Sequence, residues 1–142
     1  MRNTVEMPLS VCCSLLFFSA NSSFLLFGSF ACSGAGFADL VSMGITGASQ
    51  AGTEQFGINL VANTSPTNFG ANPDHGQFGF GSATANYGTP NVFRYVSGES
   101  IASAPRSSGV TTYTISYLVN VTPLTPGGQY TGGQTLVCTG TY

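Results

Sequence analysis

A strict alternation of apolar and polar side chains between residues 111 and 121 constrains the fold of this chain more than any other feature. The apolar side of the pattern takes every second position, at Tyr113, Ile115, Tyr117, Val119 and Val121. Successive side chains of a β-strand point to opposite faces, so this spacing predicts a strand with one apolar face. The next eight residues include two prolines and two glycines, which is turn chemistry. We therefore predict a β-hairpin in which residues 130–142 return beside the first arm.

Further short strands are expected between residue 50 and this hairpin. Apolar residues recur at short intervals in five segments, 56–62, 76–81, 83–87, 92–96 and 99–102, with Gly, Pro and Asn between them. No helical apolar period occurs after residue 50. Short strands with turns between them predict an all-β fold, and specifically an antiparallel β-sandwich of the Ig-like or WxL-like kind.

Residues 1–40 differ in composition from the rest of the chain. Arg2 supplies a positive charge near the start, and residues 7–38 contain no charged side chain. Two apolar runs lie inside this span, at 11–18 and 24–32. Such a pattern favours an export signal or an uncleaved membrane anchor. A buried helix, buried strands or an atypical N-terminus are the alternatives.

The chain has 142 residues, which is enough for one domain. Its expected organisation is an apolar N-terminal segment at 1–40, a linker or first strand at 41–50, and a β-sandwich domain at 51–142. This division follows the change from an uncharged apolar segment to alternating short strands.

The low charge excludes one class of partner. Charged residues make up 6% of the chain, and only three are Lys or Arg, whereas about 25% is typical of soluble domains. Nucleic-acid binding needs a cationic surface that displaces counterions from phosphates, and three basic residues cannot supply one. The hydrophobic fraction of 42% argues against intrinsic disorder, which usually combines low hydrophobicity with high net charge.

Several short segments, in this order, resemble a known kind of surface domain. They are Gly-Thr-Glu-Gln-Phe-Gly-Ile-Asn-Leu at 52–60, Phe-Arg-Tyr at 93–95, Ser-Gly-Glu at 97–99, the alternating run at 112–121, and Pro-Gly-Gly-Gln-Tyr-Thr at 126–131. Together they resemble the C-terminal domain of uncharacterised surface proteins of Saccharibacteria-type candidate-phylum bacteria. They are more loosely similar to WxL-type cell-wall-associated domains. The resemblance implies an exported β-sandwich of the cell envelope, without catalytic residues to carry over.

The chain departs from the WxL pattern in two ways. It contains no Trp, and residues 1–50 do not show the extended strands that usually precede the Gly-Thr-Glu-Gln-Phe segment. Missing strands would leave a sheet edge with unpaired backbone groups, and such an edge recruits another strand. We therefore expect residues 51–142 to self-associate through a sheet edge.

The ionisable residues do not predict catalysis. His75 is the only histidine, and with its neighbour Asp74 it lies in a loop without a Gly-x-Ser-x-Gly nucleophile motif. Glu54 and Glu99 are far apart in sequence, and each is typical of a charge at a strand end. We expect no enzyme activity, no cofactor and no metal site.

The four cysteines are Cys12, Cys13, Cys32 and Cys138. The adjacent pair lacks the spacer of a structural zinc site. If the first 31–38 residues are removed on export, at most Cys32 and Cys138 remain, and a disulfide between them is one possibility. The alternative, which we favour, is that Cys138 packs as a small apolar residue in the last strand.

Aromatic side chains are the remaining candidates for a binding surface. Tyr87, Phe93 and Tyr95 are the residues expected to face a ligand, with Tyr113 and Tyr117 as further candidates. An exposed row of rings would stack on a glycan, whereas the alternative is that these rings pack in the core. The sequence thus favours a non-catalytic structural domain of the extracellular surface or cell envelope. The alternative is an adhesion module that binds a glycan or a protein partner.

Overall fold

The computed structural model of the protein describes residues 9–11, 22–33, 40–104, 108–125 and 129–140. These residues form ten strands and no helix. The strands are β1 (Leu9–Val11), β2 (Ser22–Ser33), β3 (Gly47–Ala48), β4 (Gln55–Asn59), β5 (Asp74–His75), β6 (Ser82–Ala83), β7 (Val92–Phe93), β8 (Glu99–Ala104), β9 (Thr111–Asn120) and β10 (Gln129–Gly140). All pairings between these strands are antiparallel. The all-β prediction is confirmed, while the Ig-like or WxL-like sandwich topology stays a prediction.

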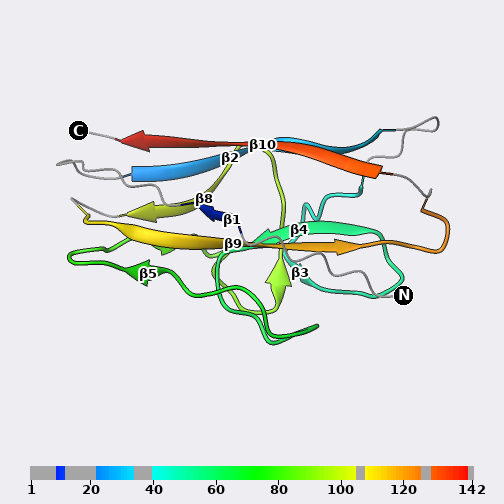
Figure 1. Ribbon diagram of the computed structural model, residues 1–142, viewed down its shortest axis with the longest axis horizontal. Coiled ribbons are helices and arrows are strands. Elements are labelled where there is room, and N and C mark those ends of the chain that lie inside the picture. The colour runs from blue at the N-terminus through cyan, green and yellow to red at the C-terminus, as the bar shows by residue number, and fades with distance from the viewer. Residues whose placement is uncertain (1–8, 12–21, 34–39, 105–107, 126–128, 141–142) are drawn as a thin grey trace.

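The strands form two four-stranded sheets and one small ribbon (Figure 1). In the first sheet β9 lies between β1 and β4 and also pairs with β5. The second sheet has the order β10-β2-β8-β6, and the ribbon joins β3 to β7. Each large sheet therefore contains strands from both halves of the chain.

The predicted hairpin of residues 111–142 is wrong in its pairing, although both of its arms are strands. β9 pairs with β4, so that Phe56 lies opposite Val119. β10 instead pairs with β2 along its whole length, from Gln129 opposite Ser33 to the last residue of the strand. Alternation specifies that a strand has one buried face, but it does not specify which strand lies beside it. The connection after β9 therefore leads into the other sheet.

The hydrophobic core contains side chains from both large sheets. Its buried members are Leu40, Phe56, Ile58, Leu60, Tyr87, Tyr95, Ile101, Ala102, Tyr113 and Ile115. Tyr117 and Val119 of β9 and Leu136 of β10 pack against this cluster. The apolar face predicted for residues 111–121 therefore meets β8 and β10 across the core.

β4 is buried on both faces, which the alternation at 56–62 did not predict. All five of its residues are buried. Phe56 and Ile58 belong to the core, and Gly57 on the opposite face packs against β7. A Cβ atom at Gly57 would lie 2.8 Å from the Cβ atom of Phe93. Behind Phe93 the ring of Phe69 stacks at a centroid distance of 5.9 Å, so a second apolar layer covers this face.

Strands from the N-terminal part belong to both large sheets, and the expected division of the chain at residues 41 and 51 stays a prediction. β1 pairs with β9, and β2 lies between β10 and β8 in the second sheet. Residues 41–50 contain β3, which follows β1 and β2 in the chain. The described residues contain no helix with the length and apolarity that a membrane span requires. Whether residues 1–40 serve in export or anchoring stays a prediction.

Candidate functional site

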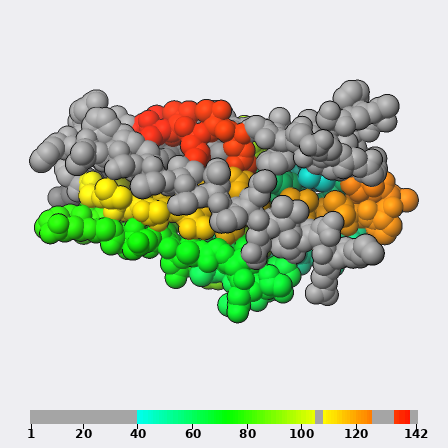
Figure 2. Space-filling model, in the orientation of Figure 1, coloured from blue at the N-terminus to red at the C-terminus, as the bar shows by residue number. Residues whose placement is uncertain are grey.

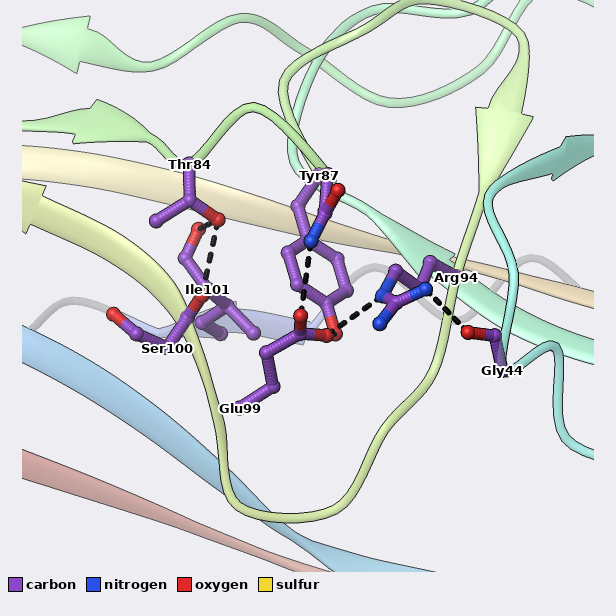
Figure 3. A network of polar contacts seen from close by, with 8 residues as sticks. Gly44, Thr84, Tyr87, Arg94, Glu99, Ser100 and Ile101 are labelled. Carbon is purple, nitrogen blue, oxygen red and sulfur yellow. Dashed lines mark hydrogen bonds and ion pairs between the residues drawn. The ribbon is translucent and has the colours of Figure 1, made fainter.

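The most extensive ionic network of the described residues centres on Glu99, the first residue of β8 (Figure 3). Its carboxylate accepts hydrogen bonds from the Tyr87 hydroxyl at 2.6 Å, from Arg94 Nε at 2.8 Å and from Asn86 Nδ2 at 2.9 Å. Arg94 also donates to the backbone carbonyl oxygen of Gly44. The Glu99 carboxylate thus connects the loop before β7 to the end of β7. Through Arg94 it is also connected to the segment before β3.

Each ionisable group of this network is held in its usual charge state. The hydrogen bond from Arg94 lowers the pKa of Glu99, against its partial burial, and the bonds from Tyr87 and Asn86 lower it further. Burial raises the pKa of Tyr87, and its hydrogen bond to Glu99 adds to this effect. At neutral pH the carboxylate is therefore ionised and the phenol is protonated, so neither is suited to proton transfer there.

Thr84 attaches the same loop to β8. Its Oγ1 atom donates to the carbonyl oxygen of Ser100 at 3.0 Å, and its backbone nitrogen donates to that of Ile101 at 2.9 Å. The bond from the hydroxyl is drawn with the Glu99 network in Figure 3, and the two bonds together place the loop along the strand. The network is therefore continuous with the backbone of the second sheet.

Three asparagines form a second polar network, which the sequence analysis missed. Asn59 Nδ2 donates to the carbonyl oxygens of Thr89 and Val92 at 2.8 and 2.9 Å. Asn59 Oδ1 accepts from Asn63 Nδ2 at 3.1 Å, and Asn63 Oδ1 accepts from the backbone nitrogen of Asn91 at 2.7 Å. Asn59 and Asn63 are buried, so these amides satisfy backbone groups of β7 and of the turn before it. The density of Asn in this part of the sequence was the available signal.

The three aromatic residues expected to face a ligand are core residues instead. Tyr87 and Phe93 are 0% exposed, and Tyr95 is 4% exposed. The ring of Tyr95 lies edge-on to Phe56 at 4.9 Å, and Phe93 is covered by Phe69. That prediction is wrong because the fold buries the large apolar area of these rings, which stabilises it.

Among the aromatic side chains whose burial is described, Phe78 and Phe80 are the exposed ones, with 70% and 56% of their surface accessible. The sequence predicted a strand at 76–81, but the structure has a loop there, between β5 and β6. Glycines at 76, 79 and 81 separate the two rings from their neighbours. That spacing of glycines was the sequence signal for a loop that presents aromatic side chains.

The proposed disulfide between Cys32 and Cys138 does not form. Cys138 has a free thiol and lies opposite Phe24 of β2, whereas Cys32 lies opposite Tyr130. Positions 24 and 32 of an extended strand are separated by about 26 Å. A disulfide requires Cα atoms within about 7 Å, so the register of the two strands rules this pairing out.

The other charged residues and the histidine that the structure describes are dispersed. Asp74 and His75 form β5 and are exposed, and Glu54 accepts a hydrogen bond from Thr125 Oγ1 at 3.1 Å. The carboxylates of Glu54 and Glu99 therefore have different partners in different parts of the fold. Within the described ranges, no group of three or more His, Cys, Asp or Glu side chains is arranged to hold a metal ion.

No family model, curated protein or solved structure matches this chain. The resemblance to Saccharibacteria-type surface domains and to WxL-type domains therefore stays a prediction.

Proposed function

We propose that this chain is a non-catalytic structural domain of the cell surface or cell envelope, which assembles with a further copy of itself. The observation that carries this proposal is the edge strand β10. It ends the second sheet, and among the described residues only β2 pairs with it. Figure 1 draws β10 as the outermost strand, and Figure 2 shows part of it, in red, at the surface.

The sequence of β10 lacks the charges and prolines that normally protect a sheet edge. It is 12 residues long, and its sequence contains neither a charged residue nor a proline. Protected edges are short, charged, interrupted by proline or covered by another element. β6, at the opposite edge of the sheet, has only two residues. The sheet therefore has one long edge, which favours a closed pair of molecules over an open fibre.

The residues 131–137 of β10 supply the chemistry of such a pairing. Alternate backbone groups of an edge strand point away from its neighbour and bind another strand through main-chain hydrogen bonds. The side chains of Thr135 and Val137 are exposed on the outer face of the sheet. Two copies of this uncharged segment are compatible side by side, because no like charges would face each other.

The use of the ionisable groups within the fold supports a structural role. The Glu99 carboxylate is occupied by three donors. Burial raises the pKa of Tyr113 to about 12 and also raises those of Tyr95 and Tyr117. Phenols with raised pKa values stay protonated at neutral pH, so these groups contribute packing and hydrogen bonds rather than reactive anions.

Light scattering after size-exclusion chromatography of the full chain tests the assembly. We expect a dimer, and we expect Val137→Lys to give monomers, because lysines near a two-fold axis repel each other and charge an edge. Ile45→Lys is the matched control, since Ile45 is 84% exposed and lies outside β10. A monomeric wild-type chain, or a dimer that tolerates Val137→Lys, contradicts the assembly.

The location is tested separately, on intact cells that produce the protein. A surface domain is degraded by protease added outside the cell and is labelled by a membrane-impermeant biotin reagent. Protection from both reagents until the cells are lysed contradicts a surface location. A second candidate function, adhesion, is favoured by the exposure of Phe78 and Phe80.

A further inference from the structure

The loop at residues 76–81 holds Phe78 in an unusual backbone conformation. The backbone nitrogen of Gly79 donates to the carbonyl oxygen of Gly76 at 3.0 Å, which closes a tight turn. Phe78 has a φ of 60°, in the left-handed region that favours glycine. Glycine adopts this conformation without steric cost. The turn itself therefore does not require an aromatic residue at position 78.

This loop is fixed to the segment that leads into β9. Four backbone nitrogens make these contacts: Gly76 to Val110 O at 3.0 Å, Gly109 to Phe78 O at 2.6 Å, Phe80 to Ser108 Oγ at 2.8 Å and Gly81 to Thr111 Oγ1 at 3.1 Å. A Cβ atom at Gly79 would collide with the Val110 carbonyl oxygen, and one at Gly81 with the Tyr113 hydroxyl. The backbone therefore lies close against its support, and the two phenyl rings project from it.

The two rings are unlike the other aromatic side chains whose placement is described. Phe78 and Phe80 are 70% and 56% exposed, whereas the other rings are buried or half-buried. The loop, next to β5 and green at the left of Figure 1, lies at one end of the first sheet. A strained backbone and exposed apolar rings both disfavour the folded state, and their coincidence indicates a binding role.

The size of the exposed surface favours a small ligand over a protein. An aromatic side chain buries about 150–250 Å², so two partly exposed rings offer on the order of 250 Å². A stable protein interface needs about 800 Å² from each partner. Two rings are therefore too small for such an interface, but they match one or two sugar rings.

The polar groups near the rings indicate which small ligand fits. Asp74, His75, Gln77 and Ser82 flank the two phenylalanines in sequence and are exposed. Among the described residues of the loop and its support, Asp74 carries the only formal charge when His75 is neutral. A carboxylate repels anionic lipid headgroups and phosphates, which bind Lys and Arg. Apolar rings with a rim of donors and acceptors suit a neutral molecule that has an apolar face and hydroxyl groups.

We propose that Phe78 and Phe80 form a stacking site for the pyranose rings of a neutral polysaccharide. The phenyl faces cover the C–H faces of the sugar, and the side chains of Gln77 and Asp74 accept or donate hydrogen bonds at its hydroxyls. The site goes beyond the structural role proposed above. It is separate from the β10 edge, so binding and self-assembly can each fail without the other.

Affinity electrophoresis of the full chain in gels that contain hydroxyethylcellulose, xylan or soluble glycol chitin tests this site. We expect at least one of these neutral polymers to retard the wild-type protein. The Phe78→Gly/Phe80→Ser variant should bind at least tenfold more weakly. Phe78→Gly also relieves the backbone conformation, so this variant should unfold no more easily than the wild type, which separates loss of binding from loss of fold.

Two controls make the result decisive. Phe78→Tyr keeps an aromatic face and should retain binding, whereas Leu124→Ser removes a 91% exposed apolar side chain elsewhere and should change nothing. The proposal is overturned if none of the three polymers retards the wild type, or if the double variant binds as well as the wild type. Ring-dependent binding to phosphatidylglycerol vesicles without binding to the polymers would also overturn the proposal, and would show that the rings bind a membrane surface instead.

Discussion

The hydroxyl of Tyr117 in β9 donates a 2.5 Å hydrogen bond to Oε1 of Gln134 in β10, so these strands meet across the core rather than within one sheet. Gln134 Nε2 is also buried, and it has no hydrogen-bond partner in the part of the chain that the structure describes. This side-chain bond connects the two large sheets at a site where one amide donor is unsatisfied among the described residues.

Removal of this bond should lower the free energy of unfolding only when one of the two polar partners remains buried. Tyr117→Phe leaves the Gln134 carbonyl oxygen buried and unpaired, and should lower the free energy of unfolding by about 1–3 kcal/mol. The double variant Tyr117→Phe/Gln134→Leu removes every buried polar atom of the pair, and should be close to the wild type or more stable. Urea unfolding of the two single variants and the double variant measures the coupling. Additive losses in the double variant would show that the bond is not buried.

Acid should weaken the Glu99 network. The pKa of Glu99 is lowered in the folded protein from its ordinary value of 4.5. The stabilisation is therefore present above the unfolded pKa, and it is lost as the pH falls through the lower folded pKa. Thermal unfolding between pH 6 and pH 2 should show a loss of stability that begins near pH 4.5 and is smaller in Glu99→Gln. An equal slope in both proteins would contradict this assignment.

Gly57 should tolerate no side chain. A Cβ atom there would approach Phe93 Cβ at 2.8 Å and the backbone nitrogen of Arg94 at 3.2 Å. We expect Gly57→Ala to destabilise the fold by about 1–3 kcal/mol through overpacking. Gly44→Ala is the control, because a Cβ at Gly44 would meet nothing within 4 Å. Equal unfolding midpoints for the two variants would show that the packing of β4 against β7 is looser than described.

The position of β2 gives the N-terminal segment a testable role. Deletion of residues 1–38 removes the strand that separates β10 from β8. We expect the fragment to aggregate, or to lose the β signal in circular dichroism, because two strand edges become exposed in the middle of a sheet. A soluble, cooperatively unfolding fragment would instead agree with the reading of this segment as a removable export signal.

The buried aromatics show where sequence reasoning failed. Tyr87, Phe93 and Tyr95 occur in short strand-like runs, where a ring on either face fits the same pattern. Burial of the second face of β4 depends on Phe93 packing against Gly57 and on Phe69 stacking on Phe93, and these residues are far apart in the sequence. No local period carries that information. The exposed pair Phe78 and Phe80 was assigned to a strand for the same reason, because alternation with glycine imitates a β pattern.

Local periodicity was sufficient to establish that this chain is built of strands and that Tyr113 and Ile115 face a core. Those properties depend only on the direction in which successive side chains point. The neighbours of each strand depended on the tertiary structure alone: β10 beside β2 instead of β9, Cys138 opposite Phe24 instead of Cys32, and Glu99 within reach of Arg94 and Tyr87. Strand pairing is decided by which surfaces fit together over long sequence separations, and a two-residue period is the same for every possible partner.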